Sequence, residues 1–326
     1  MIVLTRSQVE ALLSHETCID LLDAAMRAVS RRETELPLRR FMPVPGTTGK
    51  LGLMPGYLAS IGGFGVKIVS KYPRAFGDAL GTHIGAILLF DAATGVPIAL
   101  ADGGSVTAIR TSAASALATR VLARPDAKVL AILGAGEEAR HHVAALLCVR
   151  PFEEVVVWAR DPARAARFCD SLASRHQVHF VTAPSPEAAL ARADVACTVT
   201  SAARPFLEGR WIRIGTHLNL VGSAIATTAE VDSECVAASR FYVDFLPAAL
   251  AEAGELLAAI SEGRVTADHV VGEIGQVLLG ERLGRRDPRE ITVYKSLGIA
   301  AQDLACVAWL ASQAGNDIGT RIDLSG

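Results

Sequence analysis

The sequence predicts an α/β fold in which a Rossmann dinucleotide-binding domain occupies the middle of the chain. Beyond Pro125, short aliphatic strands alternate with helices, and this alternation is typical of a parallel sheet covered by helices. The first of these strands, residues 129–133, leads directly into a glycine-rich turn and a helix. A strand, a glycine-rich turn and a helix in this order form the pyrophosphate-binding unit of Rossmann domains.

The glycine-rich turn has residues suited to contact with phosphate. Gly134 would permit the tight turn, Gly136 would let a pyrophosphate approach the main chain, and Ala139 is small enough for close packing of the following helix. The N–H groups at the start of that helix would then face the phosphates, where the helix dipole is positive. An ordinary strand-to-helix turn is the alternative, because glycine pairs occur in such turns as well.

Length and composition indicate a globular protein whose partner is a small molecule. The chain has 326 residues, of which 51% are hydrophobic, and this is enough for two domains with separate cores. Its 32 basic and 34 acidic residues give a net charge of −2, so we expect no electrostatic surface for nucleic acid.

Cysteine spacing and the N-terminal sequence bear on metal binding and on the cellular location of the protein. The six cysteines are scattered without the spacing of a zinc site or a disulfide framework, which favours a reducing compartment. The N-terminal residues lack the basic and apolar regions of a signal peptide, and no apolar run approaches the roughly 20 residues of a membrane span. We therefore expect a cytoplasmic protein with no metal site.

The first 120 residues are expected to form a different domain, of the α+β class. Apolar residues at helical spacing predict two helices within residues 7–32. The later elements predicted here are strands at 51–55, 66–70, 85–90 and 97–101 and a helix at 105–122. A tight turn at 91–95 would join the last two strands into a hairpin.

The elements after the glycine-rich turn continue the Rossmann alternation and then become helical. The predicted strands lie at 155–158, 179–181, 195–200, 218–221 and 240–244, and the predicted helices at 138–147, 162–174, 186–191, 248–262, 270–279 and 299–314. We therefore assign residues 121–299 to the Rossmann domain, and residues 1–120 with 300–326 to a substrate-binding and dimerisation domain.

The end of the second Rossmann strand bears on which dinucleotide binds. A carboxylate there would accept hydrogen bonds from a free ribose 2′-hydroxyl, but Ala159 stands in its place. Arg160 could stack on adenine or pair with a 2′-phosphate, and Arg164 would add a second positive charge. These residues favour NADP(H). Asp161 keeps NAD(H) open, and both arginines could instead be solvated residues at a helix start.

Short motifs in matching order and spacing resemble the ornithine cyclodeaminase/mu-crystallin family, from Pro37 to about Asp303. The motifs are Pro37-Leu-Arg39, Leu51-Gly-Leu-Met-Pro55, Lys67, Thr82-His83, Leu89-Phe-Asp91, Thr94-Gly95, Asp102-Gly103, Thr107-Ala-Ile-Arg-Thr111, the Gly134–Gly136 turn, Thr198-Val-Thr-Ser201, Gly215-Thr-His-Leu-Asn219 and Tyr294-Lys-Ser-Leu-Gly298. This resemblance implies a homodimer in which an N-terminal domain and a C-terminal helix flank a Rossmann domain.

The resemblance also implies that Arg39, Lys67 and Arg110 line the substrate site, and we expect Met54 in its apolar wall. The paired N–H groups of a guanidinium suit the carboxylate of a small α-imino or α-amino acid. Lys67 stands among apolar residues, where an ammonium is costly to bury without an anion, and a substrate carboxylate would serve. The alternative is that Lys67 reaches solvent or pairs with an internal acid.

By the same resemblance, Thr82 and His83 approach the nicotinamide of the cofactor, and Arg110 with Thr111 the pyrophosphate. His83 is a candidate proton donor, although a lone histidine is more often structural, as we expect for His217. The full set of implied cofactor-binding residues is Thr82, His83, Arg110, Thr111, Gly134, Ala135, Gly136, Glu137, Glu138, Ala159, Arg160, Asp161, Arg164, Thr200, Ser201, Ala202, Val221 and Ser296.

Two departures from the cyclodeaminase pattern change the expected reaction. Cyclodeaminases carry an Asp where this chain has Ala224, and an acid for the distal ammonium of ornithine where it has Gly52. Without these carboxylates, elimination of ammonia lacks both its proton acceptor and its substrate anchor. The pattern is closer to the ketimine reductases of the family.

We therefore expect NAD(P)H-dependent reduction of a cyclic α-imino acid, Δ1-pyrroline-2-carboxylate or Δ1-piperideine-2-carboxylate, to L-proline or L-pipecolate. Arg39 and Arg110 would clamp the carboxylate, Lys67 would share its charge or relay a proton, and a hydride would pass to the imine carbon. Three alternatives stay open: an amino-acid dehydrogenase acting, for example, on alanine, an ornithine cyclodeaminase, and a protein that binds NADPH and a carboxylated ligand without turnover.

Overall fold

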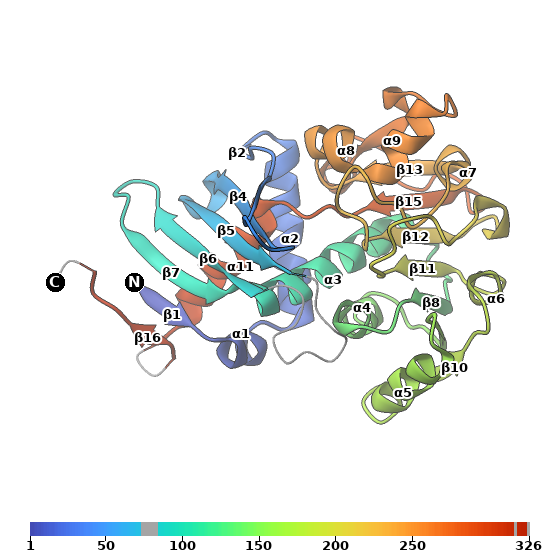
Figure 1. Cartoon of the computed structure of the whole chain (residues 1–326), viewed down its shortest axis with the longest axis horizontal. Helices are drawn as coiled ribbons and strands as arrows, with labels where there is room; N and C mark the ends of the chain where they lie inside the picture. Colours follow the sequence, from blue (N-terminus) through green and yellow to red (C-terminus); the bar gives the residue numbers. More distant parts are fainter. Residues whose placement is uncertain (73–83, 316–317, 325–326) are drawn as a thin grey trace. The chain divides into compact units, whose positions relative to one another are not determined.

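The structure, a computed structural model, describes residues 1–72, 84–315 and 318–324. Two compact units make up the chain (Figure 1). The first unit comprises Met1–Arg110 with Ile299–Gly326, and the second comprises Thr111–Gly298. The division falls within helix α3 (Gly103–Leu122), which also contains the expected boundary after residue 120. The substrate and dimer roles expected of the first unit stay predictions.

A mixed sheet forms the centre of the first unit. Its strand order is β16-β1-β7-β6-β5-β4-β2, with β3 also paired to β4. The strands are β1 (Ile2–Leu4), β2 (Thr34–Glu35), β3 (Arg40–Pro43), β4 (Lys50–Leu58), β5 (Gly63–Lys71), β6 (Ile84–Asp91), β7 (Pro97–Asp102) and β16 (Thr320–Arg321). Strands β4 to β7 form an antiparallel meander, and the predicted hairpin between β6 and β7 is confirmed. Gly95 closes that hairpin with a φ of +71°.

Helices α1 (Arg6–Leu12), α2 (His15–Ser30) and α11 (Ala300–Gln313) complete the first unit. The predicted N-terminal helices are confirmed, and Ser14 caps α2 by accepting a hydrogen bond from the Thr17 N–H at 3.1 Å. Helix α11 packs on strands β4 to β7 (Figure 1). Glycine permits this close contact, because a Cβ on Gly56 would lie 2.7 Å from Ala300 Cβ.

An all-parallel sheet forms the centre of the second unit, as the sequence predicts. The order is β10-β9-β8-β11-β12-β15-β13-β14. Chain order reverses beside β8, which has β9 on one side and β11 on the other, and Rossmann domains bind dinucleotides at such a reversal. The strands are β8 (Val129–Leu133), β9 (Glu154–Trp158), β10 (His179–Thr182), β11 (Val195–Thr198), β12 (His217–Leu220), β13 (Ser239–Val243), β14 (Val270–Glu273) and β15 (Ile291–Lys295).

Short helices connect these strands. They are α4 (Glu137–Leu147), α5 (Pro162–Ala173), α6 (Pro186–Leu190), α7 (Ser233–Ala237), α8 (Leu246–Glu252), α9 (Gly254–Ser261) and α10 (Ile274–Leu278). Single turns of 3-10 helix lie at Ala59–Ile61 in the first unit, and at Gly209–Trp211 and Ala267–His269 in the second. Within the described part of the chain, no helix combines the length and apolar composition needed to cross a bilayer.

Two predicted helices of the second unit are wrong in part. The helix expected at 248–262 is broken into α8 and α9 at Ala253, whose backbone is extended. The next residue, Gly254, packs so closely that a Cβ there would lie 1.9 Å from the Thr228 carbonyl oxygen. The helix expected at 270–279 begins only at Ile274. Residues Val270–Glu273 form the edge strand β14, which gains backbone hydrogen bonds from β13. Strands β1, β2, β3, β15 and β16 were not predicted.

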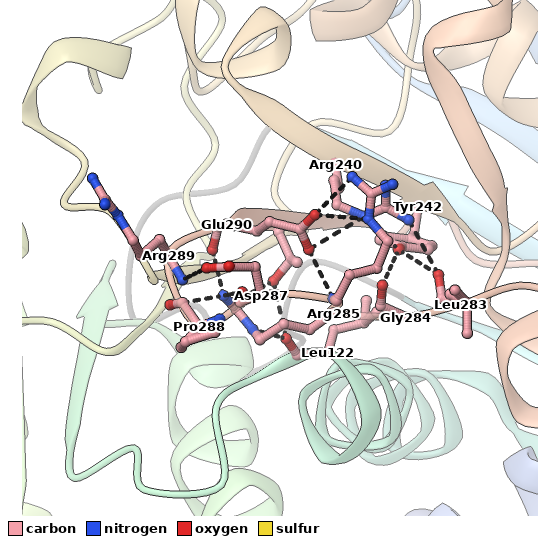
Figure 2. A network of polar contacts seen from close by, with 12 residues as sticks. Leu122, Arg240, Tyr242, Leu283, Gly284, Arg285, Asp287, Pro288, Arg289 and Glu290 are labelled. Atoms are coloured by element: carbon pink, nitrogen blue, oxygen red, sulfur yellow. Dashed lines mark hydrogen bonds and ion pairs between the residues drawn. The ribbon is translucent and has the colours of Figure 1, made fainter.

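Arg285 anchors the basic segment that precedes β15 (Figure 2). Its Nε donates a hydrogen bond of 2.8 Å to the carbonyl oxygen of Leu122, at the last turn of α3. Its Nη2 donates to Thr292 Oγ1 at 2.9 Å, and its Nη1 donates to the carbonyl oxygen of Glu290. This guanidinium therefore fixes the chain at the start of β15, the strand that ends at Lys295.

Candidate functional site

The glycine-rich turn of the second unit has the geometry of a phosphate cradle. Gly134 has a φ of +132°, and a Cβ there would lie 2.6 Å from the Val199 carbonyl oxygen, so only glycine fits. Gly136 is the N-cap of α4 and brings no side chain to the helix start. Ala139 is fully buried, as close packing of α4 requires. The first N–H groups of α4 can therefore hold a phosphate.

The residues after β9 bring positive charge to this turn. Arg164 Nε donates a 3.0 Å hydrogen bond to the Ala135 carbonyl oxygen, and its Nη2 lies 3.5 Å from where a Cβ on Gly136 would be. Asp161 is the N-cap of α5 and accepts from the Ala163 N–H at 3.0 Å. Arg160 is exposed. Asp161 thus caps helix α5. Arg164 brings its positive charge beside the glycine-rich turn.

The remaining implied cofactor residues of the second unit follow the carboxyl ends of its strands. Thr200, Ser201 and Ala202 follow β11, Val221 follows β12, and Ser296 follows β15. The Ser296 side chain is 2% exposed, and its Oγ has no hydrogen-bond partner among the described residues. A buried hydroxyl without a partner can form a hydrogen bond with a polar ligand. Together with the cradle, it fits a dinucleotide.

Glu230 connects these strand ends, and no motif in the sequence indicated this role. Its Oε1 accepts hydrogen bonds from the Thr200 N–H at 2.8 Å and the Thr200 hydroxyl at 2.6 Å. Its Oε2 accepts from the Thr198 hydroxyl and the Gly222 N–H, both at 2.7 Å. One buried carboxylate thereby ties the segment after β11 to the segment after β12.

In the first unit, Lys67 and Arg110 meet at one carboxylate oxygen. Lys67 lies on β5 and Arg110 on α3, and both side chains are buried. Asp303 Oδ1 accepts from Lys67 Nζ at 3.2 Å and from Arg110 Nε at 3.0 Å. Arg110 Nη1 also donates to Gln302 Oε1 at 3.0 Å. The alternative in which Lys67 pairs with an internal acid is therefore what the structure shows, and its contact with substrate stays a prediction.

The pKa of the Lys67 ammonium shows that Asp303 does not fully compensate its burial. Burial lowers this pKa from 10.5 to about 8, the charges of Arg110 and Arg39 act in the same direction, and Asp303 opposes them. For Asp303, burial acts to raise the pKa, but the charges of Arg110 and Lys67 outweigh it and leave the pKa lowered. A further anion beside Lys67 would stabilise the charged lysine, so this cluster suits a carboxylate ligand.

The strand opposite Lys67 supplies apolar surroundings and no acid. Met54 on β4 is the direct cross-strand partner of Lys67 and is half-buried. Two residues earlier, a Cβ on Gly52 would lie 2.9 Å from the Phe41 ring, so this ring occupies the space that an acidic side chain would need. The first unit therefore has an arrangement for one carboxylate at Lys67 and none for an ammonium at position 52.

Two of the eight histidines, His83 and His217, have roles predicted from the sequence. Thr82 and His83 lie outside the described residues, so their assigned roles stay predictions. His217 begins β12, is fully buried, and lies with Nδ1 3.0 Å from Thr292 Oγ1. Burial, and then the charge of Arg285, lowers the pKa of His217 to about 3, so the imidazole is neutral near pH 7. The structural role expected for His217 is in keeping with this environment.

Five of the six cysteines are buried, and Cys148 is exposed. All six cysteines are free thiols, and Cys18 Sγ lies 3.6 Å from Cys306 Sγ in the core of the first unit. Among the described residues, no three His, Cys, Asp or Glu side chains are placed to hold a metal ion.

Asp303 is the functional candidate that sequence reasoning missed in the first unit. The predicted terminal helix places Gln302 and Asp303 in an otherwise apolar segment, and both side chains are fully buried. Consecutive polar residues on a buried helix were the available signal, because such groups need partners. The identity of those partners could not be read from the chain, since Lys67 is 236 residues away.

The Lys67 pairing predicts a titration that can be followed by NMR with isotope-labelled lysine, since the chain has only five lysines. Lys67 should titrate near pH 8. In Asp303→Asn its pKa should fall further, because the ammonium loses its counter-ion. The signal of exposed Lys128, which pairs with Glu153, should be the same in both proteins. An unchanged or higher pKa of Lys67 in Asp303→Asn would contradict the pairing of Lys67 with Asp303.

Comparison with known proteins matches almost the whole chain. The model of the ornithine cyclodeaminase/mu-crystallin family matches residues 1–316. A Delta(1)-pyrroline-2-carboxylate reductase of Bacillus cereus is 31% identical over 325 residues, which cover 99% of this chain and 100% of that protein. The ketimine reductase mu-crystallin of Mus musculus is 36% identical over 268 residues, 82% of each chain.

Solved structures share the whole fold. The structure of Thermococcus litoralis Delta(1)-pyrroline-2-carboxylate reductase in complex with NADH and L-proline has a TM-score of 0.93 and 34% identity, covering 99% of this chain and 100% of that one. An archaeal alanine dehydrogenase dimer with bound NAD has a TM-score of 0.91 and 29% identity, covering 99% of each chain. By family match, identity and fold, this chain belongs to the ornithine cyclodeaminase/mu-crystallin family.

Proposed function

We propose that this chain is an NAD(P)H-dependent reductase of a cyclic α-imino acid, Δ1-pyrroline-2-carboxylate or Δ1-piperideine-2-carboxylate, yielding L-proline or L-pipecolate. The observation that carries the proposal is the convergence of Lys67 and Arg110 on Asp303, with Arg39 acting electrostatically on Lys67. Relatives named for Delta(1)-pyrroline-2-carboxylate reduction at 31% and 34% identity support the same reaction.

The cation cluster can bind and orient an imino acid through its carboxylate. A guanidinium offers two parallel N–H donors to a carboxylate, which fixes the plane of the attached C=N bond. An ammonium with a pKa of about 8 is largely charged near pH 7 and can also transfer a proton. A nicotinamide bound to the Rossmann unit supplies the hydride in this chemistry. A protonated cyclic imine then needs no strong general acid from the protein.

The missing acids argue against ammonia elimination from ornithine. Phe41 occupies the space beside Gly52 where an anchor for a distal ammonium would stand. Ala224, in the segment after β12, offers no carboxylate to accept a proton. A positively charged amino group on the substrate would therefore lose two favourable contacts, whereas an apolar ring would not.

Alanine dehydrogenase activity is the second candidate. The fold of an archaeal alanine dehydrogenase matches that of this chain with a TM-score of 0.91, and pyruvate offers the same carboxylate to the cation cluster. A binding protein that holds NADPH and a carboxylated ligand without turnover is the third. Both are distinguished from imine reduction by the substrates that purified protein accepts.

Purified protein should oxidise NADPH with pyrroline-2-carboxylate or piperideine-2-carboxylate faster than with pyruvate plus ammonium. Arg39→Ala and Lys67→Ala should each lower kcat/KM on the order of a hundredfold, because each removes a charged partner of the substrate carboxylate. Lys128→Ala is the matched control, since that lysine is exposed and pairs with Glu153 on the second unit's surface. Near-normal turnover in the first two variants would exclude the proposed clamp.

The cofactor we propose is NADP(H), with NAD(H) as the alternative. Arg164 borders the glycine-rich turn, Arg160 is exposed beside it, and Ala159 offers no carboxylate to a ribose. Structures of relatives with NADH and with NAD keep the second cofactor open. The KM for NADPH should be lower than that for NADH. Arg160→Ala should reduce the ratio KM(NADH)/KM(NADPH) about tenfold. Equal KM values in the unaltered protein would remove this preference.

We propose a homodimer built on the open face of the first unit's sheet. Phe64 and Ile68 on β5 are more than a third exposed, and the Phe64 ring stacks on Phe90 with centroids 5.2 Å apart. Exposed aromatic and aliphatic side chains on a sheet face suit burial against a second copy. Analytical ultracentrifugation should give twice the chain mass of 34.3 kDa, and a particle of one chain mass would exclude the dimer.

A further inference from the structure

Buried acids outnumber buried bases at the carboxyl ends of the second unit's strands. Lys295 is the last residue of β15, Glu273 is the last residue of β14, and Asp244 directly follows β13. Glu230 and Glu255 lie in the chain after β12. All five side chains are at most 1% exposed. Four buried carboxylates therefore accompany one buried ammonium on this edge of the sheet.

The single ammonium is balanced by one of the four acids. Lys295 Nζ lies 2.9 Å from Glu255 Oε2 and donates a 2.5 Å hydrogen bond to the Ser223 carbonyl oxygen. The other oxygen of Glu255 accepts from the Glu230 N–H at 3.1 Å. The Lys295–Glu255 pair is neutral as a whole, and it holds the chain at Ser223 and Glu230 in place.

Glu230 forms no ion pair with Lys295, which is paired with Glu255. Its four hydrogen bonds come from the hydroxyls of Thr198 and Thr200 and from the N–H groups of Thr200 and Gly222. Thr200 Oγ1 accepts from the Ala202 N–H, which directs the hydroxyl proton toward Glu230. Burial raises the pKa of Glu230 above its usual range, and the hydrogen bonds from Thr200 and Thr198 and the charge of Lys295 offset this only in part. Both oxygens of Glu230 nevertheless accept hydrogen bonds, from four donors in total, and this donor set fits the ionised carboxylate.

The place of this charge points to the cofactor. Glu230 binds the segments that follow β11 and β12, on the side of the strand-order reversal away from β8, β9 and the glycine-rich turn. In a Rossmann domain whose first half holds the adenosine part, the second half holds the other nucleotide. Ser296, with its unpartnered buried hydroxyl, lies next to Lys295 on the same edge.

We propose that Glu230 favours the oxidised, positively charged nicotinamide over the reduced, neutral one, and so assists hydride donation. This inference rests on the proposed function. In the reaction, a hydride leaves the dihydronicotinamide with both electrons of its C–H bond and forms the new C–H bond at the carbon of a protonated imine. The cofactor is oxidised and gains a positive charge, and the imine is reduced to the amine. A fixed carboxylate in a buried, preorganised setting stabilises that developing charge.

The test compares dissociation constants of NADP+ and NADPH, measured without substrate by calorimetry and by NADPH fluorescence. Glu230→Gln and Glu230→Ala remove the charge, and each should raise the ratio Kd(NADP+)/Kd(NADPH) on the order of tenfold. Both variants also loosen the strand ends, so the two affinities can fall together. A loss of positioning weakens both affinities and leaves the ratio Kd(NADP+)/Kd(NADPH) unchanged, whereas a loss of charge changes the ratio. If one of the two variants does not fold, the other is enough for the test.

Two controls change the same network without changing its net charge. Lys295→Met combined with Glu255→Gln replaces the neutral ion pair by neutral side chains. Thr198→Val removes one donor to Glu230 and keeps the carboxylate. In both, the Kd ratio should equal that of the unaltered protein, even where both affinities are weaker. A ratio that shifts as far in these controls as in the Glu230 variants would overturn the proposal.

The outcomes also separate this inference from the proposed function. If the unaltered protein binds both nucleotides and reduces an imine, but the ratio is unchanged in the Glu230 variants, only the role of Glu230 fails. If the unaltered protein binds neither nucleotide, the proposed function fails and this inference fails with it.

Discussion

The burial of Lys67 and Arg110 on one carboxylate oxygen of Asp303 is the constraint on which the candidate substrate site depends. Neither cation could lie at its depth in the first unit without an anion, because a buried charge without a partner is strongly destabilising. The pairing is incomplete, since the pKa of Lys67 still falls to about 8. That shortfall is the reason why we propose this cluster as the binding site of a substrate carboxylate.

In the second unit, neutral hydrogen-bond donors surround a buried carboxylate, that of Glu230. Glu230 is as deeply buried as Lys67, but hydroxyl and backbone N–H groups stabilise it where an ion pair would cancel its charge. These hydrogen bonds fix the segments after β11 and β12. The buried cations of the first unit and the buried carboxylate of the second are the observations on which the proposed substrate site and the proposed role of Glu230 rest.

Periodicity was sufficient for most of the fold because each unit buries its sheet in a regular way. The alternating strands and helices after Pro125, the hairpin at Gly95 and the two N-terminal helices follow from local patterns. The errors occur where neighbours decide. Val270–Glu273 is a strand because β13 offers it hydrogen bonds, and the expected helix at 248–262 breaks where Gly254 meets Thr228.

The sequence by itself determined the Rossmann turn, because this turn is a property of residue type and spacing, and the resemblance of its motifs to a family implied the candidate cations and the absent acids at Gly52 and Ala224. Only the tertiary structure decided which groups pair: Asp303 with Lys67 and Arg110, and Glu230 with the strand ends. The physical reason is that electrostatic partners are chosen by distance in space. Asp303 is 236 residues from Lys67 along the chain, and packing of α11 on the first unit's sheet brings them to 3.2 Å.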